Sequence, residues 1–149
     1  MCIFHQICTI LGAPGRVVNL MHTDNDNDKV WGVAYEVDDE LWEKEICAQL
    51  DHREKGGYTQ HRIQFHPKDQ TETPKEVTIY LGDKSNRQYA GPDSLDVMAS
   101  TILNSVGPSG QNKEYLYNLA EAMLEIDPND THLYELDRAV KKLDKQLIS

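Results

Sequence analysis

Apolar and polar residues alternate along several stretches of the first half of the chain, as they do in β-strands with one buried face. The strands predicted from this alternation are Arg16 to Met21, Lys29 to Val37, Tyr58 to Phe65 and Glu76 to Leu81. In the second of these, Trp31, Val33 and Tyr35 share one face, and in the third, Ile63 and Phe65 share the side expected to be buried. The pattern therefore predicts a small antiparallel or mixed sheet in the first half of the chain.

The polar run from Asp24 to Asp28 separates the first two predicted strands and favours a hairpin turn. Its acidic side chains fall at alternate positions, as in a calcium-binding loop. However, Lys29 stands where that loop requires Gly, and Tyr35 stands where it requires a bidentate Glu. We therefore interpret the run as a turn and not as a calcium site.

The first eleven residues, Met1 to Leu11, are mostly apolar and uncharged. They lack the basic residue before the apolar run and the small residues at a cleavage site that a signal peptide needs. The stretch is also too short to span a bilayer. It is predicted to form a strand or a poorly packed leader.

The apolar residues have a helical period in two parts of the chain, the segment that follows Val37 and the residues after Pro92. Asp38 and Asp39 open one predicted helix; Asp93 or Ser94 caps a second, Ser109 can cap a third, and a fourth ends the chain. The last helix carries an apolar stripe at spacings of three and four, formed by Leu133, Leu136, Val140, Leu143 and Leu147. This stripe is expected to pack in the core and not to form a dimer seam, because the adjacent β-structure offers a surface to bury it.

The 149 residues predict a single domain, residues 1–149, with a formal net charge of -10. Such a charge repels nucleic acid and anionic membrane surfaces, so neither is expected as a partner. The three cysteines, Cys2, Cys8 and Cys47, lack CxxC spacing and indicate reduced thiols in a cytosolic, cytoplasmic protein.

A metal site is not expected, although the chain has six histidines. His61 and His66 are an odd number of residues apart on one predicted strand, so they point to opposite faces. The other histidines form no HxxxH or HExxH pattern, and no Gly-rich phosphate loop or GxSxG elbow is present. The sequence predicts neither a metal nor a cofactor.

The strongest candidate for catalysis is Glu54, which stands between two cations and just before Gly56 and Gly57. The pattern before it is helical and the pattern after it alternates, so it lies at a predicted helix-to-strand turn. A charged triplet such as Arg53-Glu54-Lys55 is also typical of a solvated helix end, and that interpretation stays open on this stretch alone. One carboxylate can serve as both acid and base if the nucleophile lies within the substrate.

Several ordered motifs resemble one known family. They are Pro14-Gly15-Arg16-Val17-Val18, Val30 to Tyr35, Arg53 to Tyr58, Tyr89 to Pro92 with Ala90 in place of the family's Leu, and Gly107 to Gly110 followed by Asn112, Glu114, Tyr115 and Leu116. Together they resemble the ChaC-type γ-glutamylcyclotransferases, the glutathione-specific group. The likeness covers Ala13 to Lys145.

The resemblance implies an α+β fold, a mixed γ-glutamylcyclotransferase-like β-barrel with peripheral helices. It implies conversion of glutathione to 5-oxoproline and cysteinylglycine by a lyase that needs no cofactor, with Glu54 as the general acid and base. Gly57, Tyr58 and Tyr89 would bind the substrate. Glutathione is the implied small-molecule partner, and the protein is expected to be a monomer.

The chain departs from the family at its start, since Met1 to Gly12 does not resemble the family's first strand, its Tyr-Gly-Ser-Leu loop or the strand that follows. We therefore expect an N-terminally shortened domain that lacks these strands, is less active and less stable than a version carrying them, and exposes the apolar faces of Trp31 and Val33. Whether it is an isoform or a gene-model artefact stays open. The alternative function is a non-catalytic module that binds glutathione or a protein partner.

Overall fold

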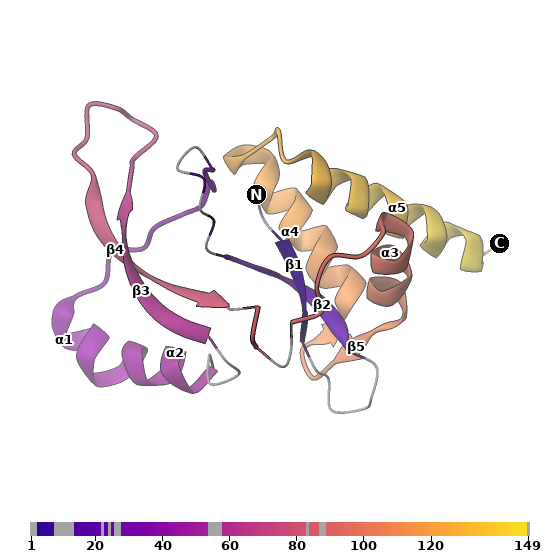
Figure 1. Ribbon diagram of the computed structural model, residues 1–149, viewed down its shortest axis with the longest axis horizontal. Helices are drawn as coiled ribbons and strands as arrows, with labels where there is room; N and C mark the ends of the chain where they lie inside the picture. Colours follow the sequence, from indigo (N-terminus) through magenta and orange to yellow (C-terminus); the bar gives the residue numbers. More distant parts are fainter. Residues whose placement is uncertain are drawn as a thin grey trace.

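The computed structural model describes residues 3–7, 14–21, 23, 25, 28–53, 58–82, 84–86 and 89–148. The elements in chain order are β1 (Ile3–Ile7), β2 (Gly15–Asn19), α1 (Asp39–Leu41), a π-helical turn η1 (Trp42–Ile46), α2 (Cys47–Arg53), β3 (Tyr58–Phe65), β4 (Lys75–Gly82), α3 (Leu95–Asn104), β5 (Val106–Gly107), β6 (Gly110–Gln111), α4 (Asn112–Ile126) and α5 (Thr131–Ile148). Figure 1 shows β1 and β2 between the β3–β4 hairpin on one side and helices α3, α4 and α5 on the other. Within the described part of the chain, no helix has both the length and the hydropathy needed to cross a bilayer.

The predicted strands from Tyr58 to Phe65 and from Glu76 to Leu81 are confirmed as β3 and β4. They pair antiparallel, with Tyr58 opposite Gly82 and Phe65 opposite Lys75. The strand interpretation of the chain's start is also confirmed, because β1 pairs antiparallel with β2.

The predicted strand from Lys29 to Val37 is wrong, since residues 28–38 adopt no regular structure. The hairpin turn predicted at Asp24 to Asp28 is therefore wrong as well, although within that run the Asp28 amide donates to the Asn25 carbonyl at 3.0 Å. A strand needs the backbone of a partner, and β2 is paired with β1 instead of with this segment. Trp31 and Val33 are 46% and 59% exposed, as expected.

The described strands do not form the mixed barrel that was expected. They make three two-stranded sheets, β1–β2, β3–β4 and β5–β6, and every pairing is antiparallel. A closed barrel gives each strand two neighbours, whereas each described strand has one. The α+β class holds, and the barrel does not appear among the described residues.

The predicted helix starts are confirmed at two places and wrong at one. The side chain of Asp38 accepts from the Glu40 amide at 2.9 Å, and that of Ser94 accepts from the Val97 amide at 3.4 Å. Ser109, expected to cap the next helix, lies instead in the turn between β5 and β6. That short hairpin delays the start of α4, whose N-cap residue is Gln111.

The core lies between the helices, which are therefore not peripheral. Its buried apolar side chains come from α3, α4 and α5: Met98, Ala99, Ile102, Leu116, Ala120, Met123, Leu133, Leu136 and Val140. The core interpretation of the last helical stripe is thus confirmed for its first three members, while Leu147 is 72% exposed. Of the strands, β2 reaches this core through Val18.

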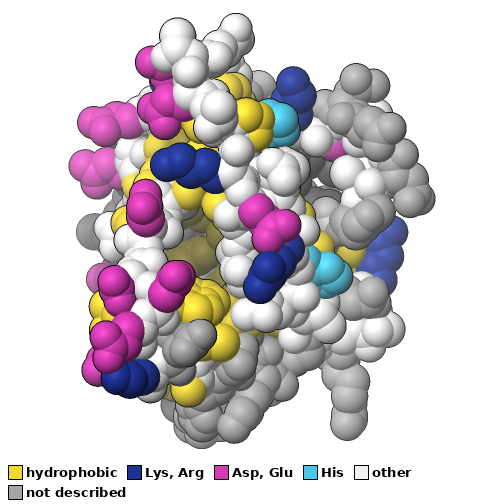
Figure 2. Space-filling model, turned by 90° about the vertical axis from the view of Figure 1, so that its left-hand side faces the viewer, with side chains coloured by type: hydrophobic (Ala, Val, Ile, Leu, Met, Phe, Trp, Pro, Cys, Tyr) yellow, Lys and Arg dark blue, Asp and Glu magenta, His cyan; other side chains and the backbone are white. Residues whose placement is uncertain are grey.

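The β3–β4 hairpin, in contrast, buries little apolar surface. Ile63, predicted to be buried, is 42% exposed. Figure 2, which views the molecule from the side of this hairpin and of α1, shows hydrophobic side chains at the surface among acidic ones. Apolar and polar residues therefore alternate along β3, although no core among the described residues covers its apolar face.

Candidate functional site

Two of the four predicted site residues, Glu54 and Gly57, lie outside the described residues. The elements on either side of them are described: α2 ends at Arg53, and β3 begins at Tyr58. The predicted order of a helix followed by a strand is therefore confirmed, while the roles of Glu54 and Gly57 stay predictions.

The other two predicted site residues, Tyr58 and Tyr89, are both half-buried. Tyr58 opens β3 opposite Gly82, the last residue of β4. Tyr89 lies in the connection between β4 and α3, where its amide donates to the Asn86 carbonyl at 2.9 Å. The two tyrosines thus belong to different segments, and a third segment must hold both in place.

The end of strand β2 holds the segment that carries Tyr58. The Gly82 amide donates both to the Leu20 carbonyl and to the Asn19 side-chain oxygen, each at 3.2 Å. Asn19 is only 8% exposed, so these bonds are shielded from water. They attach the paired ends of β3 and β4 to β2.

The start of β2 holds the loop that carries Tyr89. Arg16 is 4% exposed; its Nη1 donates to the Gly91 carbonyl at 3.2 Å, and its Nη2 forms an ion pair with Asp93. Gly91 has a φ of 71°, a left-handed conformation that favours glycine. Arg16 therefore fixes the loop two residues after Tyr89.

Residues at the start of helix α4 hold the backbone of β2 in place through hydrogen bonds. The side-chain oxygen of Asn112 accepts from the Arg16 amide at 2.7 Å, and its nitrogen donates to the Arg16 carbonyl at 2.8 Å. The Tyr115 hydroxyl accepts from the Val18 amide at 3.3 Å. A Cβ at position 15 would lie 2.6 Å from the Asn112 oxygen, so Gly15 permits this close approach.

Strand β2 is therefore a frame on which both described site residues are anchored. Arg16 and Asn19, its two anchoring side chains, are three residues apart along the strand. Tyr58 and Tyr89 have aromatic faces and hydroxyl groups of the kind that commonly line sites for small polar molecules, and their role in binding stays a prediction. Nowhere in the described part of the chain do three His, Cys, Asp or Glu side chains gather so that they could hold a metal ion.

Comparison with known proteins shows the family to which this chain belongs. A family model described as ChaC-like protein matches residues 8–143. The chain belongs to the ChaC-like family. It is 37% identical over 131 residues to glutathione-specific γ-glutamylcyclotransferase 1 of Danio rerio, covering 85% of this chain and 65% of the relative. It is 37% identical to the protein of the same name from Homo sapiens, covering 58% of that relative.

The family's fold is also shared. The crystal structure of a yeast γ-glutamylcyclotransferase specific to glutathione matches with a TM-score of 0.72 at 23% sequence identity, covering 94% of this chain and 84% of that one. This chain spans less than two thirds of the length of the Danio rerio and Homo sapiens relatives. The motif-based resemblance is thus confirmed at the level of family and fold.

The family motifs now have structural roles that the sequence alone did not assign. Arg16, Gly91 and Asn112 were noticed as motif residues, and the structure joins them in one hydrogen-bonded cluster. Asn19 and Gly82 were not singled out. In the sequence, Asn19 is a residue with a side-chain amide and Gly82 is a small residue, and each stands at the end of an apolar strand. Such residues are too common at strand ends to identify a site.

Replacing Gly82 by Ala is expected to destabilise the protein by about 1–3 kcal/mol, as overpacking a filled site does. The added Cβ would lie 1.9 Å from the Asn19 side-chain nitrogen, and Asn19 is buried and cannot swing into solvent. Urea denaturation measures the change. Gly32→Ala is the matched control, because nothing lies within 4 Å of its added Cβ. Equal stabilities of the two variants would contradict the close contact between Gly82 at the end of β4 and Asn19 at the end of β2.

Proposed function

We propose that this chain acts as a glutathione-specific γ-glutamylcyclotransferase, converting glutathione to 5-oxoproline and cysteinylglycine. The observation that carries the proposal is the 37% identity, over 85% of this chain, to relatives that bear this name. The β2 frame supports it, because the motif residue Arg16 forms hydrogen bonds there with two other motif residues, Gly91 and Asn112. Since the chain spans only part of those relatives, its own activity is a proposal.

In the proposed mechanism, the α-amino group of the γ-glutamyl residue reacts in its neutral form, and Glu54 accepts one proton from it. The freed amine attacks the γ-carbonyl carbon of the same residue and closes a five-membered ring. The bond between that carbon and the cysteinyl nitrogen then breaks, and Glu54 returns the proton to the departing nitrogen. The attack is intramolecular, so holding the γ-glutamyl arm in a bent conformation supplies much of the rate enhancement.

The remaining proposed roles follow from position in the chain. Gly57 allows the backbone to approach the substrate, and Tyr58 and Tyr89 form walls of the pocket and donate hydrogen bonds to it. We propose that the protein works as a monomer in the cytosol, with glutathione as its small-molecule partner.

The test is to incubate the purified protein with glutathione and to measure 5-oxoproline and cysteinylglycine. We expect the two products in equal amounts, and no product from peptides that lack a γ-glutamyl linkage. Glutathione that binds, as measured by calorimetry, without any 5-oxoproline being formed would overturn the enzymatic proposal and favour the non-catalytic binding module.

The activity is expected to survive dialysis against EDTA and to need no added nucleotide. The reason is that the proposed chemistry uses only a carboxylate and an internal amine, with no step that requires a Lewis acid. Turnover is measured before and after chelation. Activity that is lost on chelation and restored by zinc or calcium would contradict the cofactor-free mechanism.

A further inference from the structure

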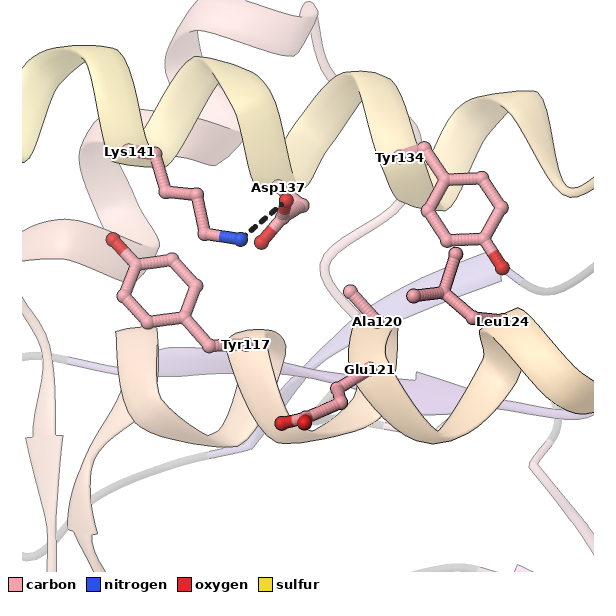
Figure 3. A pocket seen from close by; sticks show the side chains of 7 residues that line it. All are labelled: Tyr117, Ala120, Glu121, Leu124, Tyr134, Asp137 and Lys141. Atoms are coloured by element: carbon pink, nitrogen blue, oxygen red, sulfur yellow. Dashed lines mark hydrogen bonds and ion pairs between the residues drawn. The ribbon is translucent and has the colours of Figure 1, made fainter. Parts of the chain in front are cut away.

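A pocket of about 330 Å³ lies between helices α4 and α5, and none of its lining residues takes part in the candidate site. Figure 3 shows the residues that line it: Tyr117, Ala120, Glu121 and Leu124 from α4, and Tyr134, Asp137 and Lys141 from α5. None of them belongs to the β2 frame or to the segments that carry Tyr58 and Tyr89. A ligand held here would therefore be separate from the proposed substrate.

The polar group that stands out in this pocket is the carboxylate of Asp137, a residue only 8% exposed. One of its oxygens, Oδ2, accepts from Lys141 Nζ at 2.8 Å. The other, Oδ1, is buried and has no hydrogen-bond partner among the described residues. Figure 3 shows this carboxylate pointing from α5 into the gap toward α4. A buried acceptor without a donor is costly, so a donor entering the pocket would be favourable there.

The donors that line the pocket already have partners. The Tyr117 hydroxyl donates to Asp144 at 3.4 Å, and the Tyr134 hydroxyl donates to the Asp127 carbonyl at 2.9 Å. Burial, and then the nearby Asp144 carboxylate, raise the pKa of Tyr117 to about 12, so its ring stays uncharged. Lys141 forms an ion pair with Asp137, and its Nζ lies 5.0 Å from the centre of the Tyr117 ring.

The charges of the pocket favour a cation. Its lining carries two carboxylates, Asp137 and the exposed Glu121, against the single ammonium of Lys141. Lys141 engages only one oxygen of Asp137, so the other can accept a hydrogen bond from a ligand. The formal net charge of -10 on the whole chain adds a long-range attraction for cations.

We infer that this pocket binds a small organic cation with a flat apolar body. The amidinium, guanidinium or ammonium group of the ligand donates to Asp137 Oδ1. Its body lies against Ala120 and Leu124, between the rings of Tyr117 and Tyr134. Aromatic faces beside a carboxylate suit such a ligand, because they attract the cation and bury the apolar part together.

The first experiment uses the full chain and two probes of the same shape, the benzamidinium cation and the benzoate anion. Binding is followed by calorimetry and by the NMR shifts of the methyl groups of Ala120 and Leu124. We expect saturable binding of benzamidinium at millimolar concentrations, with shifts confined to α4 and α5, and binding of benzoate at least about tenfold weaker. Equal binding of both probes, or no binding of benzamidinium, would overturn the inference.

The second experiment compares Asp137→Asn with Glu135→Gln. Glu135 is an exposed acid on the same helix that does not line the pocket, so its replacement controls for the loss of one negative charge. We expect Asp137→Asn to weaken benzamidinium binding about tenfold or more, and Glu135→Gln to leave it unchanged. Wild-type affinity in a folded Asp137→Asn variant would overturn the assignment. If that variant does not fold, the comparison of the two probes on the wild-type protein still decides.

Discussion

Replacing Glu54 by Gln is expected to lower the turnover of glutathione by about 10²–10⁴-fold, the usual contribution of a positioned general acid and base. The amide has nearly the same shape as the carboxylate, but it cannot accept a proton at neutral pH. Because the proposed mechanism asks one group both to remove and to return the proton, its loss affects both steps. The rate of 5-oxoproline formation at saturating glutathione measures the effect.

The matched control for this variant is Glu45→Gln, which replaces an exposed acid in η1, earlier in the chain than Glu54. It removes the same charge and is expected to leave turnover unchanged. Circular dichroism and the urea midpoint should be the same for both variants and the wild type. A Glu54→Gln protein as fast as its parent would show that the acid and base role has been assigned to the wrong residue.

Replacing Leu136 by Ala is expected to destabilise the protein by about 2–5 kcal/mol, because it removes buried apolar contacts and leaves a cavity. Leu136 has no exposed surface and lies in α5 within the core that α3, α4 and α5 share. That loss is a large part of the about 5–15 kcal/mol that stabilises a typical domain. Urea denaturation, with the slope compared between variants, measures it.

Leu147→Ala is the control in the same helix. Leu147 belongs to the same apolar stripe in the sequence, yet it is 72% exposed, so its truncation is expected to change stability by no more than about 0.5 kcal/mol. The pair therefore tests the position of the core and not merely the hydrophobicity of the side chain. Equal losses in the two variants would contradict a core centred on the first half of α5.

Local patterns in the sequence determined most of the secondary structure. The alternation in residues 58–65 and 76–81 predicted β3 and β4 almost to the residue, because side chains alternate between faces of any strand. Ser94 and Asp38 marked helix starts, because their short polar side chains accept from amides that the first helical turn leaves unpaired. The motifs also identified the family, which the match over residues 8–143 confirms.

The sequence was less informative where an outcome depends on residues far apart. Lys29 to Val37 alternates as well as β3 does, yet alternation does not name a partner, and β2 pairs with β1 instead. Ile63 looked buried for the same reason, although no described layer covers that face of the hairpin enough to bury it. Ser109 could cap a helix by its type, but the β5–β6 hairpin occupies that stretch.

Only the tertiary structure decided how the candidate site is held together. Arg16 and Asn112 are 96 residues apart in the chain, yet the side chain of Asn112 forms two hydrogen bonds to the Arg16 backbone. Asn19 and Gly82 are also far apart in the chain, yet the Gly82 amide donates to the Asn19 side chain. The pocket that contains Asp137 likewise combines residues of two helices, α4 and α5. Periodicity and capping depend on neighbours within a few residues, so a single sequence reveals them. Pairing, burial and side-chain anchors depend on which distant segments meet, and in this protein the packing of α3 and α4 against β2 decides that.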